Sequence, residues 1–156
     1  THKAQEVGHH SEMILAGRRI NDGMGAHAGQ LVLDAMIARG TAPAKSRALV
    51  LGVAFKENCP DIRNTLVAST ISYLQDRGVT VDVHDPWVDP EEARKELGLN
   101  LTASPEKGAY DAAVLAVAHD VFEKMGADGV KTFLKPSGVL ADLKWAFDAN
   151  ETDTRL

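Results

Sequence analysis

Residues 47–65 read RALVLGVAFKENCPDIRNT, and this stretch decides the class of fold. Its first part, Arg47–Gly52, is a short apolar run that indicates a strand buried on both faces. A charged loop follows, and the apolar spacing beyond it predicts a helix at Asn64–Arg77, which Gly78 closes. A buried strand, a loop and a helix in this order are typical of one half of a βαβ unit.

The same alternation continues toward the end of the chain. We expect strands at residues 79–83, 111–118 and 138–142, a helix at 90–97 and a broken helix at 121–135. Strands that alternate with helices need crossover connections, which place the strands parallel in one sheet. The sequence therefore predicts an α/β fold, with a Rossmann-like parallel sheet of about five strands and helices on both faces.

One long helix, at residues 11–39, precedes this unit. Apolar residues from Ile14 to Met36 recur at helical spacings, and Gly40 gives a stop signal. Glycines at positions 23, 25 and 29 weaken its middle and predict a kink or a close contact with another helix. We therefore expect a helical segment at 1–40 and the Rossmann-like domain at 41–156.

The composition is that of an ordinary soluble protein. The 156 residues are 44% hydrophobic and 25% charged, which suits one core of normal size. A net charge of −5 provides no basic field for nucleic acid, and no apolar run is long enough for a membrane span. The single cysteine, Cys59, excludes an internal disulfide and favours a cytoplasmic location. The first residue is Thr1 rather than methionine, which suggests part of a longer protein or a processed one.

Two cations follow the first strand, at the edge of the sheet where ligands bind in open parallel folds. A dinucleotide-binding loop would need three glycines here, and only Gly52 is present, so this is not a standard pyrophosphate cradle. Lys56 and Arg63 lie near the start of the expected helix, whose free N–H groups attract anions. The residues alone leave two interpretations open: a local anion site or solvated surface charges.

The segment GVAFKENCPDIRNT, at residues 52–65, resembles the signature of the nucleotide-sugar dehydrogenase family. The matching residues are Gly52, Phe55, Lys56, Asp61 and Arg63. Other segments resemble further motifs of the family in the same order: THKAQEVG (1–8), ILAGRRIND (14–22), VDVHDPWVD (81–89), AVLAVAHDVF (113–122) and VLADLKWAFD (139–148). The form N-C-P-D-I-R-N-T is most similar to members that act on UDP-N-acetylated sugars.

This resemblance implies the C-terminal UDP-binding domain of an NAD-dependent UDP-N-acetylhexosamine or UDP-glucose 6-dehydrogenase. Such enzymes oxidise the sugar C6 alcohol to a uronate through a thiol-linked intermediate and serve polysaccharide biosynthesis. The family binds NAD mainly on an N-terminal domain that this sequence lacks, as it lacks the motif of the nucleophilic cysteine. We therefore expect no catalytic residue here and an inactive fragment. A homodimer or larger assembly through the long helix is also implied.

The family's binding residues carry over one by one. The resemblance implies that Phe55 and Lys56 contact the UDP-sugar and that Arg63 reaches NAD across a cleft. Lys144 matches a further substrate contact at which some members have arginine. His119 follows the strand at 111–118, and it either lines the nucleotide pocket or is a surface loop histidine.

Some alternatives remain. Asp61 either orients Arg63 through a paired hydrogen bond or serves as a turn or helix-start carboxylate, which the residues favour slightly. Cys59 does not match the nucleophile motif and has no adjacent histidine, so we do not expect it to be catalytic. No histidine or cysteine spacing indicates a metal site. Rival functions are a stand-alone nucleotide- or CoA-binding module and a structural dimerisation domain.

Overall fold

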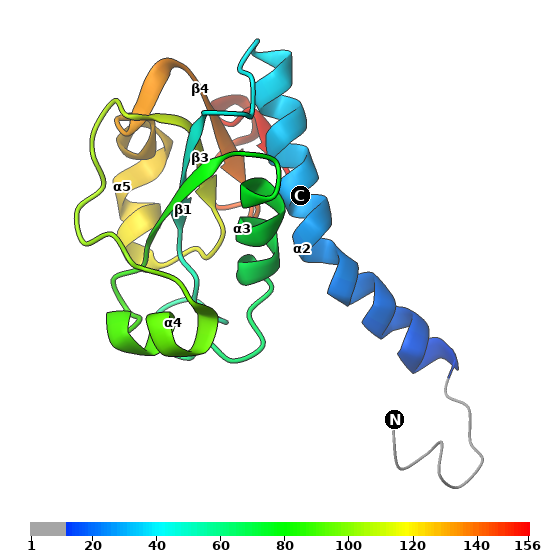
Figure 1. Cartoon of the computed structure of the whole chain (residues 1–156). Coiled ribbons are helices and arrows are strands. Elements are labelled where there is room, and N and C mark those ends of the chain that lie inside the picture. Colours follow the sequence, from blue (N-terminus) through cyan, green and yellow to red (C-terminus); the bar gives the residue numbers. More distant parts are fainter. Residues whose placement is uncertain (1–11) are drawn as a thin grey trace, which may run out of the picture.

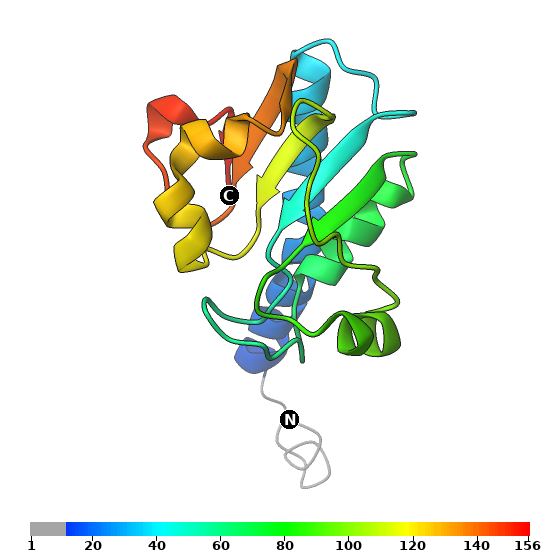
Figure 2. The ribbon, with the colours of Figure 1, turned by 90° about the vertical axis from the view of Figure 1, so that its left-hand side faces the viewer.

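Five parallel strands form the centre of the structure, a computed structural model that describes residues 12–156. The strands lie in the order β2-β1-β3-β4-β5 (Figure 2), and each neighbouring pair is parallel. Their bounds are β1 (Arg47–Leu51), β2 (Thr80–His84), β3 (Tyr110–Leu115), β4 (Leu134–Asp142) and β5 (Thr154–Arg155). The expected Rossmann-like parallel sheet is confirmed.

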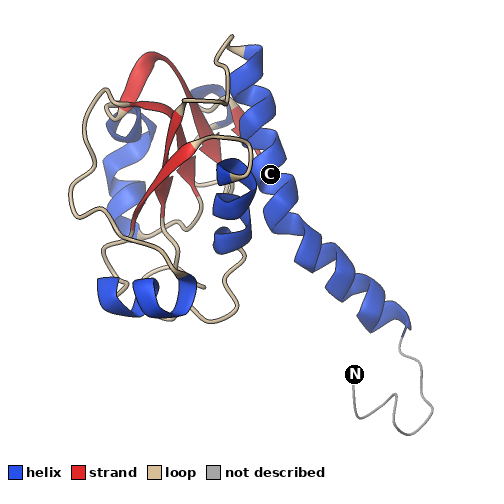
Figure 3. Ribbon diagram, viewed as in Figure 1, coloured by secondary structure: helices blue, strands red, loops and turns tan. Residues whose placement is uncertain are grey.

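Helices cover both faces of this sheet (Figures 1 and 3). They are α2 (Glu12–Ala38), α3 (Val67–Gln75), α4 (Pro90–Leu97) and α5 (Asp120–Lys131), with a short 3-10 helix, η1, at Ala149–Glu151. α2 and α3 pack on one face and α5 on the other (Figure 1). Because successive strand residues point to opposite faces, Ala48 and Val50 join the first core, while Leu49 and Leu51 join the second.

Two glycines of α2 explain how closely that helix approaches α3. A Cβ atom at Gly25 would lie 2.6 Å from the Cβ of Ser69, and one at Gly29 would lie 2.7 Å from Cδ1 of Tyr73. Thr70 adds a hydrogen bond from its hydroxyl to the carbonyl of Gly25, at 2.9 Å. The close helix contact expected from the glycines is therefore confirmed.

The first half of α2 extends beyond the sheet (Figure 1). Its apolar residues Met13, Ile14 and Ile20 are 89%, 59% and 69% exposed, and the buried residues of the helix begin at Gly25. The helical spacing that begins at Ile14 therefore predicts the helix, but Ile14 does not join the core, because α2 reaches the domain only farther along. The second half contributes Val32, Leu33 and Met36 to the same core as β1.

Several element ends differ from those expected. α3 begins at Val67 rather than Asn64, because Asn64 has a φ of 60°, outside the helical region. The helix expected at 121–135 ends at Lys131, and β4 begins at Leu134, which pairs with Tyr110 of β3. The expected break in that helix is present at Gly126, where φ is 71°. Within the described residues, no helix is both long and apolar enough for a membrane span.

Candidate functional site

The loops that follow β1, β3 and β4 meet at the carboxyl edge of the sheet. The chain passes from β1 to β2 on one side and reaches β3 on the other, so the strand order reverses between β1 and β3. Ligands bind at this reversal point in open α/β sheets. Gly52, directly after β1, has a φ of 86°, and a Cβ atom there would lie 2.5 Å from Cβ of Val117. A glycine at this position therefore lets the two loops come together.

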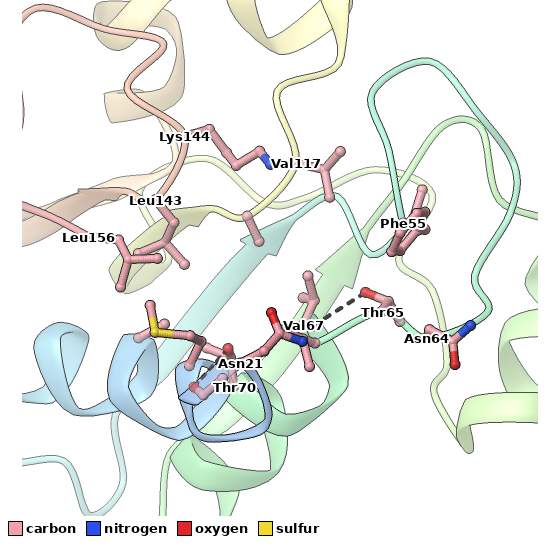
Figure 4. A pocket seen from close by; sticks show the side chains of 16 residues that line it. Asn21, Phe55, Asn64, Thr65, Val67, Thr70, Val117, Leu143, Lys144 and Leu156 are labelled. Carbon is pink, nitrogen blue, oxygen red and sulfur yellow. Dashed lines mark hydrogen bonds between the residues drawn. The ribbon is translucent and has the colours of Figure 1, made fainter. Parts of the chain in front are cut away.

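A pocket of about 260 Å³ lies at this edge, between α2, the start of α3 and the three loops (Figure 4). Its apolar wall includes Ala54, Val117, Leu143 and Leu156, and its polar lining comes from Asn21, Asn64, Thr65, Thr70 and Lys144. In Figure 4, Lys144 lies on one side of the pocket and Asn21 on the opposite side. A cavity with an apolar wall and few polar groups is typical of a small-molecule site.

The start of α3 faces this pocket. Residues 64–67 line it, and Leu66, the residue before the helix, has no side-chain cap. Among residues 12–156, the hydroxyl of Thr65 accepts from the N–H of Val67 at 3.3 Å at this end of the helix. The helix N-terminus carries a partial positive charge and attracts anions.

Phe55 and Lys56 lie side by side in the loop after β1. Phe55 lines the pocket and is 50% exposed, and Nζ of Lys56 lies 5.9 Å from the centre of its ring. Lys56 is exposed and does not line the pocket itself. The structure therefore places the aromatic ring at the pocket and the ammonium beside it.

Arg63 is paired with Asp61 of its own loop. Nε and Nη2 of Arg63 donate to the two oxygens of Asp61 at 2.9 and 2.7 Å, and the backbone N–H of Arg63 donates to the same carboxylate at 2.9 Å. These hydrogen bonds, with a smaller effect from Lys56, lower the pKa of Asp61 to about 2. Asp61 thus both orients Arg63 through paired hydrogen bonds and serves as a turn carboxylate that accepts a backbone N–H. The charges of Lys56 and Arg63 both act on this carboxylate.

Lys144 reaches the pocket from the loop after β4. Its Nζ lies 3.1 Å from Oε1 of Glu57, and its backbone N–H donates to the buried carboxylate of Asp142 at 2.9 Å. The pKa of Glu57 is lowered, first by a hydrogen bond from its own backbone and then by Lys144. The ion pair joins the loops after β1 and β4 across the site.

One of the two sequence interpretations had His119 lining the nucleotide pocket. In the structure His119 is not among the residues that line it. Its side chain is fully buried, its Nδ1 accepts from the N–H of Asn58 at 2.8 Å, and its Nε2 lies 3.2 Å from Oδ2 of Asp85. Both ring nitrogens are thus bonded within the protein. The surface-loop alternative is also wrong, because the turn after β3 folds this ring inward.

Comparison with known proteins identifies the family to which this domain belongs. Residues 49–149, well over half of the chain, match the model of the UDP-glucose/GDP-mannose dehydrogenase family, UDP binding domain. The chain belongs to this family. The matched region of this UDP-binding domain contains all of the residues predicted to bind ligand or cofactor, from Phe55 to Lys144.

Two curated relatives align with the whole chain, including the helical segment before the UDP-binding domain. The chain is 47% identical to UDP-N-acetyl-D-glucosamine 6-dehydrogenase from Pseudomonas aeruginosa and 44% identical to the protein of the same name from Salmonella typhi, in both cases over all 156 residues. The chain spans 37% of the length of each of these relatives.

Solved structures share the fold. An NDP-N-acetyl-D-galactosaminuronic acid dehydrogenase from Methanosarcina mazei Go1 superimposes with a TM-score of 0.79 at 25% identity, over 91% of this chain and 30% of that one. A UDP-glucose dehydrogenase from Pyrobaculum islandicum superimposes with a TM-score of 0.76 at 26% identity, over 99% of this chain and 34% of that one.

Cys59 is half-buried in the loop after β1 of the UDP-binding domain. His119 contacts the neighbouring Asn58, but both of its ring nitrogens are bonded, so it does not serve the thiol as a base. Residues 12–156 contain no group of histidine, cysteine and carboxylate side chains placed to hold a metal ion. The segment THKAQEVG, His9 and His10 lie outside the described residues.

Sequence reasoning missed the polar residues that shape the site. Asp85 and Asp142 are buried carboxylates at the ends of β2 and β4, and each accepts backbone N–H groups of the loop that follows. A carboxylate at the carboxyl end of a strand is the signal that could have indicated them. Asn21 and Asn64 carry no such signal, since their place on the pocket wall depends on how α2 and α3 pack.

Proposed function

We propose that this chain is the C-terminal UDP-sugar-binding part of an NAD-dependent UDP-N-acetylhexosamine 6-dehydrogenase, with N-acetylglucosamine as the sugar. The observation that carries this proposal is the pocket at the strand-order reversal, which joins Phe55, Lys144 and the N-terminus of α3 in a family UDP-binding domain. The names of the two relatives at 44–47% identity support the choice of sugar. In this proposal the full-length enzyme oxidises the C6 alcohol to a uronate.

The electrostatics of the pocket suit a diphosphate. The chain carries a net charge of −5, so an anion needs a local positive site. Lys144 and the first turn of α3 both line the pocket, with Lys56 beside it, and these three groups supply that site. The ring of Phe55, half exposed at the pocket, offers an apolar surface for a base or sugar.

NAD, when bound, supplies the hydride acceptor. The loop after β1 has one of the three glycines of a dinucleotide cradle, so these residues do not fit the main NAD site. Arg63 does fit a single contact to an anionic group presented from outside this domain, because its side chain is 82% exposed. To make that contact it would exchange its bonds with Asp61 for bonds with the cofactor.

Titration calorimetry of the full-length protein tests this function. We expect binding of UDP-N-acetylglucosamine and UDP, weaker binding of UDP-N-acetylgalactosamine, UDP-N-acetylmannosamine and UDP-glucose, and no binding of acetyl-CoA. Binding of acetyl-CoA but of no uridine nucleotide would favour the rival module. We expect the chain of 156 residues alone to produce no NADH.

We also propose a homodimer formed through α2, in the cytoplasm. The exposed side chains of Met13, Ile14 and Ile20 supply apolar surface on the extended half of this helix. A single half-buried thiol suits a reducing compartment. Light scattering of wild type and of an Ile20→Lys variant tests the assembly, since the added charge should shift the protein to a monomer.

A further inference from the structure

The loop after β1 is fixed at its start by Asp85. The carboxylate of Asp85 accepts hydrogen bonds from the N–H groups of Val53 at 2.7 Å and Ala54 at 3.0 Å. Its other oxygen accepts hydrogen bonds from the N–H groups of Trp87 at 2.9 Å and Val88 at 3.3 Å. Burial by itself would raise the pKa of Asp85, but hydrogen bonds from His119 and from these backbone groups outweigh it and leave the pKa below its usual value. The ionised carboxylate therefore holds the loop at the residues just before Phe55.

The same loop is fixed a second time by His119. Because the N–H of Asn58 donates to Nδ1 of His119, that nitrogen carries no proton, and the ring proton lies on Nε2, where it points at Oδ2 of Asp85. One buried ring thus links the carboxylate at the end of β2 to the middle of the loop. Its bonds go to the backbone of the loop, not only to the core.

Asn58 has further bonds that make this second point firm. Its side chain donates to Asp120 at 2.6 Å and accepts from the N–H of Asp120 at 3.0 Å. Its own φ is 55°, in the left-handed region, which asparagine adopts more readily than most residues. The three residues Phe55, Lys56 and Glu57 therefore span a short distance between two fixed points.

We propose that Asp85 and His119 are positioning residues for the nucleotide-sugar. They hold residues 53–58 so that Phe55 faces the pocket, Glu57 pairs with Lys144, and Nζ of Lys56 lies 5.9 Å from the centre of the Phe55 ring. This inference rests on the proposed UDP-sugar binding and assigns a part in it to two side chains that do not line the pocket.

Two variants of His119 separate positioning from packing. In His119→Asn the amide oxygen takes the place of Nδ1 and can still accept from Asn58, whereas His119→Gln can still donate to Asp85 but leaves the N–H of Asn58 without its acceptor. Both variants remove the imidazole ring, whose centre lies 5.7 Å from that of the Phe122 ring and 6.4 Å from that of the Trp87 ring. If His119 acted only through packing, the two variants would therefore show the same loss. His27→Gln, on the exposed face of α2, is the control for the chemical change.

The experiment has two readouts on the full-length protein. Without ligand, amide hydrogen exchange of residues 53–60 should be about tenfold faster in His119→Gln and within about threefold of wild type in His119→Asn. In calorimetry, the dissociation constant for UDP should rise about tenfold in His119→Gln, equivalent to about 1.4 kcal/mol, and stay within about threefold in His119→Asn.

The outcomes separate the two proposals. Equal changes in both variants, or wild-type exchange in both, would overturn the positioning role. Faster exchange in His119→Gln with unchanged UDP affinity would also overturn it, because the loop would then be fixed without consequence for binding. If wild type itself fails to bind UDP or UDP-sugars, the proposed function is wrong, and the exchange measurement still decides whether His119 fixes the loop.

Discussion

Replacing Gly52 by alanine perturbs the approach of the two loops at the strand-order reversal. Two effects add. The φ of 86° is unfavourable for any residue with a Cβ, by about 1–2 kcal/mol. The new methyl carbon would also lie 2.5 Å from Cβ of Val117 and 3.0 Å from its backbone nitrogen. Forcing atoms into a packed core destabilises by about 1–3 kcal/mol, so the sum is about 2–5 kcal/mol.

Thermal unfolding with a matched variant measures these two effects separately. Gly98, after α4, has a similar φ of 68°, but nothing lies within 4 Å of a Cβ atom placed there. Gly98→Ala should therefore lose only the backbone contribution and lower the Tm by about 4 °C, whereas Gly52→Ala should lower it by about 10 °C. UDP affinity should fall in Gly52→Ala alone, because Val117 lines the pocket. Equal Tm values for the two variants would refute the reasoning, since the contact with Val117 would then have no effect.

The remaining predictions concern single side chains of the site. Lys56→Ala in the full-length enzyme should weaken UDP-sugar binding by about 1.5–3 kcal/mol, as for a hydrogen bond to a charged group, and an unchanged KM and kcat would remove Lys56 from the site. Lys144→Ala should raise the dissociation constant for UDP about tenfold, while Lys144→Arg, which keeps the positive charge, should stay closer to wild type in calorimetry. Asp85→Asn should lower the Tm at neutral pH. Because the folded-state pKa of Asp85 is depressed, its stabilisation is present above the unfolded pKa of about 3.9 and is lost below it. Melting curves should show the difference from wild type shrinking as the pH falls below about 4, and a difference that widens in acid would contradict this assignment.

The order of strands and helices could be predicted because β1 and most of β3 are buried apolar runs, with helical spacings between them and after them. The run at 47–52 and the strand expected at 111–118 both lie in the sheet, although β3 ends at Leu115. β5 was not found, since two residues are too few for any periodic pattern. The start of α3 was misplaced because the left-handed conformation of Asn64 depends on the fold of the whole loop.

The site could be predicted in part. The loop after β1 was identified from its place at a strand end and from its resemblance to the family, and the structure puts Phe55 and Lys144 on one pocket. That these residues bind UDP-sugar stays a prediction. The position of His119 was not predictable, because a histidine after a strand can point outward or inward. The buried carboxylate of Asp85 and the N–H of Asn58 hold the ring inward, and both are brought near it only by the fold.

α2 both forms the wall of the pocket and extends beyond the domain. Asn21, Met24 and Gly25 line the pocket at the point where the helix leaves the sheet, and Gly25 and Gly29 fix its second half against α3. A tilt of the extended half that moves Asn21 would change the width of the pocket. A ligand that prefers one pocket width therefore favours one tilt of the helix. By thermodynamic reciprocity, a partner that holds the extended half of α2 in that tilt raises the affinity for the ligand by the same factor as the ligand raises the affinity for the partner.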